Sequence, residues 1–320
     1  MSSALLNAPL LFFVLGLVSR VVRSDLRVPR ALSKALSIYL LAGIGLHGGA
    51  QLAKADLATL LAPSLAALGL ACLLPLMAYV TLRRMLGLDG FNAAAIAAHY
   101  GSVSVATFLA AGAWLTANDI PHEPATVLML AIMEVPAILI GLTLAQRCRG
   151  SQSGISSSWL DSLRGTLRHG SVLLLIGSLI IGATATRSSL EGIKPFFESL
   201  FMGALCLFLI DLGIQAAARL GSIRAQMLPL ALFGVAAPLV FGCIGLAVGH
   251  FLLGFGAGGS MLVAMLAASA SYIAVPPAMR LGVPEANPAL YLLLALGVTF
   301  PFNLVVGIPL FNFLAQWISA

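Results

Sequence analysis

Ten stretches of mainly apolar residues follow one another along this chain, and each is long enough to cross a lipid bilayer as a helix. A spanning helix requires about 20 mainly apolar residues. We therefore predict an all-α integral membrane protein with ten transmembrane helices, the first of them a spanning segment rather than a cleaved leader. The stretches cover residues 5–22, 32–53, 58–82, 91–116, 124–146, 171–187, 196–218, 227–252, 258–280 and 288–318.

The composition excludes an ordinary soluble protein. Of the 320 residues, 60% are hydrophobic and only 9% are charged, whereas a soluble domain carries about 25% charged residues. The four cysteines are scattered and form no C-x-x-C pair, so we interpret them as packing residues. The lipid bilayer is thus the expected solvent for most of the surface.

The basic residues predict the orientation of the chain in the membrane. One set of alternate loops holds 14 of the 17 lysines and arginines, and such an excess marks the cytoplasmic side. We expect both termini outside and the 147–170 loop in the cytoplasm, in a bacterial-type inner membrane. The net charge of +6 then faces anionic lipid, and we expect no nucleic-acid partner. The 14 residues are Arg20, Arg23, Arg27, Arg30, Lys34, Arg83, Arg84, Arg147, Arg149, Arg164, Arg168, Arg219, Arg224 and Arg280.

The two halves of the chain resemble each other at an offset of about 166 residues. Pro63 corresponds to Pro229, and the segment 101–106 corresponds to 268–273. Five such pairings occur in the same order at offsets of 164–167 residues. Because five helices per half is an odd number, the second copy must be inverted relative to the first. We predict a first repeat over 1–146, a cytoplasmic linker over 147–170 and a second, inverted repeat over 171–320.

The fourth and ninth stretches carry matching polar motifs near their middles. Inverted repeats with interrupted helices are typical of transporters that bind substrate at the membrane midplane. If both helices break there, their N-termini and serine hydroxyls can hold an anion. The alternative is that small residues mark close helix packing. The predicted substrate-binding residues are Gly101, Ser102, Val103 and Ser104 in the first motif, and Ser269, Ala270, Ser271 and Tyr272 in the second, which Pro276 and Pro277 follow.

Ionisable and oxygen-bearing side chains within the spans are candidates for cation coupling. Asp211 and Glu134 could bind a cation or carry a proton, or could be hydrogen-bonded structural acids. Thr299 and Asn303 flank Pro301 in the tenth stretch and offer neutral oxygens that suit sodium. His47 and His99 also lie within spans, with either a packing or a proton-linked role.

Sequence motifs for catalysis and for resident cofactors are missing. The chain contains no G-x-x-x-x-G-K-[ST], no H-E-x-x-H and no C-x-x-C. We therefore expect neither an enzyme nor a metal or cofactor site, apart from sodium as a co-substrate.

Several segments resemble the sodium-dependent bicarbonate transporter family. They are Ile44-Gly45-Leu46-His47-Gly48-Gly49, Gly101-Ser102-Val103-Ser104, the block from Met265 to Tyr291 and the block from Gly307 to Gln316. The resemblance implies ten helices in two inverted halves, a mobile core and a homotrimer. It also implies sodium-driven uptake of bicarbonate between the broken fourth and ninth helices. A cytoplasmic regulatory protein is a further candidate partner. Tyr272 stands where the family pattern has an acidic residue, so Asp211 becomes the first candidate for the balancing carboxylate.

These observations lead to one functional expectation. We predict a secondary active transporter that imports a small anion, with bicarbonate as the first substrate, coupled to sodium or protons. It would work by alternating access with an elevator-like core. The alternatives are an organic-anion symporter of similar ten-helix architecture and an anion-binding membrane receptor that does not transport.

Overall fold

The computed structural model describes residues 8–53, 57–150, 170–220 and 227–320, and within these ranges the chain is helical and contains no strand. The first half comprises α1 (Ala8–Val21), α2 (Arg30–Leu52), α3 (Leu57–Arg84), α4 (Gly90–Gly101), α5 (Val105–Ala117), α6 (Ala125–Met133) and α7 (Pro136–Gly150). Most of the predicted 147–170 linker lies outside the described residues. The all-α class expected from the sequence is therefore confirmed for the described residues.

The second half is also helical and contains more irregular turns. Its α-helices are α9 (Gly170–Thr184), α10 (Arg187–Lys194), α11 (Phe201–Leu220), α12 (Leu228–Ala247), α13 (Ala257–Ala268), α14 (Val275–Gly282), α15 (Pro288–Leu292), α16 (Phe300–Phe302) and α17 (Ile308–Ser319). Wider π-helical turns occur as η2 (Pro195–Ser199), η4 (Val248–Leu252), η5 (Leu293–Thr299) and η6 (Asn303–Gly307). The short helix α10 was not among the predicted elements.

Six helical segments of the described chain are long and apolar enough to cross a membrane. Two shorter apolar helices, Leu11–Val21 and Ala257–Ala268, accompany them. The protein is thus a multi-pass membrane protein. The six segments are Leu60–Arg84, Gly90–Ala117, Ala125–Arg149, Phe201–Ala218, Leu228–Leu252 and Pro288–Ser319.

The tenth stretch stays helical although it contains Pro301 and Pro309. Helical turns run without a break from Pro288 to Ser319. Proline removes one backbone N–H and crowds the carbonyl four residues earlier. The π-helical segments η5 and η6 lie just before Pro301 and Pro309, and their wider turns accommodate this change without ending the helix.

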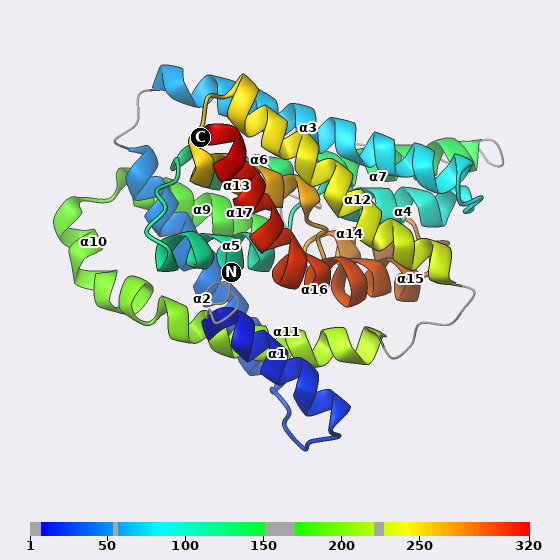
Figure 1. The fold of residues 1–320 in the computed structure, drawn as a ribbon, viewed down its shortest axis with the longest axis horizontal. Helices are drawn as coiled ribbons and strands as arrows, with labels where there is room; N and C mark the ends of the chain where they lie inside the picture. The colour runs from blue at the N-terminus through cyan, green and yellow to red at the C-terminus, as the bar shows by residue number, and fades with distance from the viewer. Residues whose placement is uncertain (1–7, 54–56, 151–169, 221–226) are drawn as a thin grey trace.

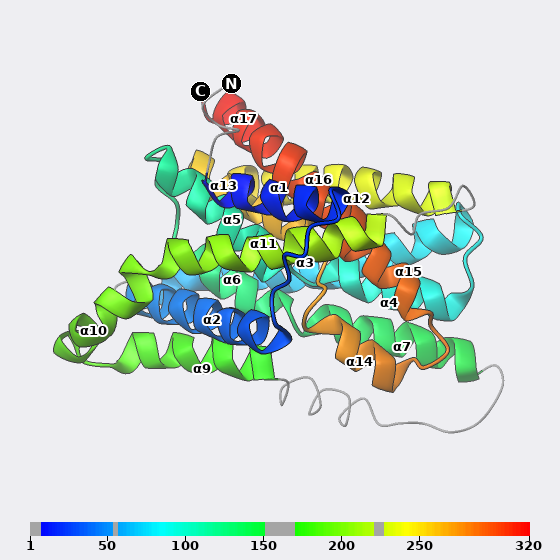
Figure 2. The same cartoon turned by 90° about the horizontal axis from the view of Figure 1, so that it is seen from below.

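The helices form two groups. The scaffold helices, α1, α2, α9 and α11, pair as α1 with α11 and α2 with α9. The core helices are α3 to α7 and α12 to α17. Among them, α4 and α13 are almost wholly buried, and the other core helices pack around these two. In Figure 1 the pair α1 and α11 lies at the edge opposite α3, and Figure 2 shows α2 and α9 running side by side.

Glycines allow the scaffold pairs to approach closely. Gly16 and Gly213 lie where α1 crosses α11, and Gly49 and Gly182 lie where α2 crosses α9. A Cβ atom at any of the four would come within 2.2 Å of a carbonyl oxygen on the facing helix. Only glycine permits such contact, because a real Cβ cannot approach a backbone oxygen this closely.

Candidate functional site

The two serine motifs meet in the centre of the core. The helical path breaks between Gly101 and Val105 and again between Ala268 and Val275. The backbone N–H of Ser104 donates a hydrogen bond to Ser269 Oγ at 2.9 Å. We call this meeting point the crossing. It is buried from solvent, and it brings together predicted substrate-binding residues that are 165 positions apart in the sequence.

A second contact ties the crossing to α4. The backbone N–H of Ser271 donates to the carbonyl oxygen of His99 at 2.8 Å. The imidazole Nδ1 of His99 lies 2.7 Å from Ala95 O, and its ring stacks on Tyr291 at a centroid distance of 4.4 Å. These contacts fit the packing alternative expected for His99, while its Nε2 has no hydrogen-bond partner among the described residues.

Local chemistry explains why the first helix breaks. The backbone of Ser102 and Ser104 is extended, and Ser104 Oγ accepts hydrogen bonds from the N–H and the hydroxyl of Thr107. Ser104 thus caps the N-terminus of α5, as serine commonly does. Gly101 ends α4 against α3, where a Cβ would lie 2.4 Å from Pro75. The capping serine and this close approach fix the position of the break.

The two new N-termini differ in the donors that they offer. The first N–H groups of α5 have no carbonyl partner within their own helix. In α14, which begins at Val275, the next two positions are Pro276 and Pro277. Proline has no N–H, so this helix start lacks two of the donors that the sequence reading assigned to it. The crossing is therefore asymmetric, with most backbone donors on the α5 side.

A cavity of ≈ 670 Å³ leads from the exposed side chains Arg30 and Lys34 toward the crossing, and we call it the vestibule. Tyr272 and Asp211 both line it, the former from the second serine motif and the latter from α11. Tyr272 is 9% exposed, and its ring packs edge-on against Phe300.

The carboxylate of Asp211 is held by hydrogen bonds from two scaffold helices. Ser33 Oγ on α2 and Gln215 Nε2 on α11 both donate to Asp211 Oδ2. Ser33 and Ser37, which also lines the vestibule, were missed in the sequence reading. Their spacing of four residues, which places two hydroxyls on one face of an apolar helix, is the signal that could have found them.

The family model of the Na⁺-dependent bicarbonate transporter superfamily matches residues 8–316 of the chain. The chain belongs to this superfamily. No curated protein matches the chain. Membership indicates a transporter of the membrane rather than an enzyme, and it confirms the resemblance seen in the serine motifs and the C-terminal blocks.

The remaining coupling candidates of this transporter lie around the crossing in different environments. Thr299 Oγ1 donates to Gly234 O at 2.7 Å and lies 2.6 Å from the hydroxyl of Tyr100. Asn303 Nδ2 donates to Ala268 O, the last residue of α13, at 2.8 Å. Asn303 Oδ1 has no hydrogen-bond partner among the described residues. Thr299 and Asn303 therefore tie the tenth stretch to the crossing.

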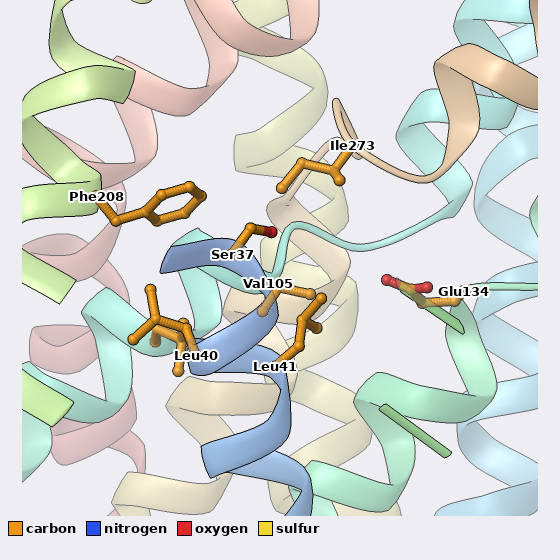
Figure 3. A pocket seen from close by; sticks show the side chains of 8 residues that line it. Ser37, Leu40, Leu41, Val105, Glu134, Phe208 and Ile273 are labelled. Carbon is orange, nitrogen blue, oxygen red and sulfur yellow. The ribbon is translucent and has the colours of Figure 1, made fainter. Parts of the chain in front are cut away.

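Glu134 is a buried acid at the turn between α6 and α7. It is 2% exposed, and its Oε2 has no hydrogen-bond partner among the described residues. Figure 3 shows its carboxylate beside a small cavity, with Val105 and Ile273 between it and Phe208. Val105 is the first residue of α5 and Ile273 follows the second serine motif, so this cavity adjoins the crossing.

An ion pair between Arg149, the last residue of the segment Ala125–Arg149, and Glu285, which lies outside the six segments, joins the end of α7 to the end of α14. Arg149 Nε donates to Glu285 Oε1 at 2.6 Å, and its Nη2 donates to Glu285 Oε2 and to Gly282 O. The hydrogen bond from Arg149 holds the pKa of Glu285 below its ordinary value. The side chain of Glu285 is 38% exposed, so water screens this pair.

Proposed function

We propose that this transporter imports bicarbonate and that the crossing is where the anion binds. The observation that carries the proposal is the contact of two interrupted helices in a buried core, through Ser104 and Ser269. The start of α5 supplies unpaired N–H groups and a partial positive charge of about half an electron. Such a helix start can hold a small anion without a buried arginine.

Ten spanning helices in two inverted repeats, 1–146 and 171–320 joined by the 147–170 linker, fit the packing of the chain. The close contact of α1 with α11 corresponds to that of α9 with α2. Gly16 corresponds to Gly182 and Gly49 to Gly213, at offsets of 164–166 residues. The ends of the core helices correspond as well. Glu123 Oε1 accepts from Gly256 N at the start of α13, and Asn92 Oδ1 at the start of α4 accepts from Asn287 N. Paired contacts of this kind support the repeat.

Alternating access would move the core helices past the scaffold helices, as in an elevator. The vestibule connects the crossing to Arg30 and Lys34, which belong to the face predicted to be cytoplasmic. This conformation would then be open toward the cytoplasm, with both chain termini outside. The resemblance to the family supports a homotrimer and a cytoplasmic regulatory protein as partners.

Uptake would be driven by sodium or by protons. Asp211 in the vestibule and Glu134, Thr299 and Asn303 around the crossing are the coupling candidates. Asp211 already accepts two hydrogen bonds, whereas Glu134 and Asn303 each keep a buried oxygen without a partner among the described residues. A cation that binds with the anion would offset the cost of burying its charge.

Uptake of labelled bicarbonate into proteoliposomes tests the proposal. Wild-type protein should accumulate bicarbonate when a sodium or proton gradient is imposed, and Ser104→Leu should not, because the bulky side chain fills the crossing. Ser188→Leu, at an exposed position of α10, is the matched control and should transport normally. Competition by organic anions without bicarbonate uptake would favour an organic-anion symporter. Binding without any flux would favour a receptor.

A further inference from the structure

A small cavity adjoins Glu134, a buried acid whose Oε2 has no hydrogen-bond partner among the described residues. Its volume is ≈ 10 Å³, about enough for one water molecule. Apart from Glu134, only Ser37 contributes a polar side chain to its wall. The other six lining residues are apolar, namely Leu40, Leu41, Val105, Leu109, Phe208 and Ile273.

This lining is poorly suited to a metal cation. Hard cations take about six oxygen ligands, and the wall offers one carboxylate and one hydroxyl. An ionised carboxylate left alone in such surroundings costs several kcal/mol. A proton satisfies the carboxylate with no further ligands, since the group then becomes neutral and can itself donate a hydrogen bond.

The cavity lies between the two groups of helices. Ser37, Leu40 and Leu41 come from α2 and Phe208 from α11, which are scaffold helices, whereas Glu134 belongs to the core. Any sliding of the core would carry Glu134 along this apolar wall. A neutral side chain can make that movement at little cost, and a charged one would have to cross apolar side chains without a partner.

The other described titratable groups on the neighbouring elements do not line this cavity. None of them is among its eight lining residues, and no described salt bridge includes Glu134. They are Arg30, Lys34, Tyr39 and His47 on α2, Cys72, Tyr79, Arg83 and Arg84 on α3, His99 and Tyr100 on α4, Arg147, Cys148 and Arg149 on α7, Cys206 and Asp211 on α11, and Tyr272 after the second serine motif.

We propose that Glu134 is a proton-binding site on the core–scaffold boundary, and that the core moves only when Glu134 carries its proton. The proton binds to a carboxylate oxygen and is released to water when the site is next accessible. The proposal rests on the proposed alternating access. It adds a proton-linked step whether sodium or protons drive accumulation.

Infrared spectroscopy of the reconstituted protein tests the site without any substrate. Between about pH 5 and about pH 10, the wild type should show a carboxylic acid C=O band that disappears as the pH rises. Glu134→Gln should lack this band, and Glu134→Asp should retain it. Glu198→Gln removes a 47%-exposed carboxylate and should leave the band unchanged. Absence of the band in the wild type at every pH, or its persistence in Glu134→Gln, would overturn the proposal.

Transport measurements then test the role in movement. With equal pH on both sides and a constant bicarbonate concentration, wild-type flux should fall about tenfold per pH unit once Glu134 loses its proton. Glu134→Gln should give a flux independent of pH, and Glu198→Gln should follow the wild type. An identical pH profile in wild type and Glu134→Gln overturns the coupling to movement. Absence of bicarbonate flux in the wild type would refute the proposed function, and the infrared result would still decide the proton site.

Discussion

Replacing Ser269 by alanine is the sharpest test of the crossing. Ser269 is 1% exposed, and its Oγ accepts from the N–H of Ser104 and donates to Leu266 O, both at 2.9 Å. The substitution removes one oxygen and leaves the N–H of Ser104 buried without its acceptor. A buried donor that loses its partner costs about 1–3 kcal/mol.

The loss should appear in substrate affinity as well as in stability. The missing bond is one of the described hydrogen bonds between the two interrupted stretches, another being that from the N–H of Ser271 to His99 O. If the lost hydrogen bond destabilises only the conformation that binds bicarbonate, its whole free-energy cost appears in binding. The dissociation constant of bicarbonate should then rise about fivefold to 150-fold, since 1.4 kcal/mol corresponds to a factor of ten. Binding of labelled bicarbonate and thermal unfolding of the same preparation measure the two effects.

Ser260→Ala is the matched control within the same helix. Ser260 is fully buried in α13, and its hydroxyl donates to Phe255 O at 3.0 Å, away from the crossing. This variant should lose about 0.5–1.5 kcal/mol of stability and keep wild-type affinity. Wild-type affinity in Ser269→Ala as well would show that bicarbonate does not bind at the crossing.

Three further changes test other parts of the structure. Gly213→Ala places a Cβ 2.2 Å from a carbonyl oxygen of α1, so it should lower thermal stability by about 1–3 kcal/mol, whereas Gly203→Ala, with open space around it, should be neutral. Asp211→Asn should abolish the dependence of uptake on the sodium or proton gradient, while anion binding survives. Uptake by wild-type protein at a rate that depends on neither gradient would contradict this. The hydrogen bond from Arg149 lowers the pKa of Glu285 in the folded protein. The ion pair should therefore stabilise the fold above about pH 4.3, the pKa of an unfolded glutamate. This stabilisation should disappear as the pH falls through the lower pKa that Glu285 has in the folded protein. Melting temperature against pH, compared with Glu285→Gln, measures that loss.

The hydropathy of the chain was enough to predict the helices and their breaks. Lipid requires long apolar helices, and a serine motif beside glycine or proline inside such a run has few structural explanations. Six of the ten predicted stretches correspond to described segments that are long and apolar enough to cross a membrane, and both expected interruptions occur at the serine motifs. The sequence alone does not show that the tenth stretch stays helical through Pro301 and Pro309, because a proline removes only one hydrogen bond and a wider turn can accommodate that loss.

The roles of individual polar side chains were decided by tertiary structure alone. Asp211 and Glu134 look alike in the sequence, as single acids within apolar runs. In the fold, α2 supplies a hydroxyl to Asp211, while Glu134 faces an almost entirely apolar wall. The number of free backbone N–H groups at the start of α14 also depended on where that helix begins. It begins at Val275, so the next two positions are prolines, which have no N–H. A sequence records which groups are present, but partners from distant segments determine whether a buried group is satisfied, and that decides its chemistry.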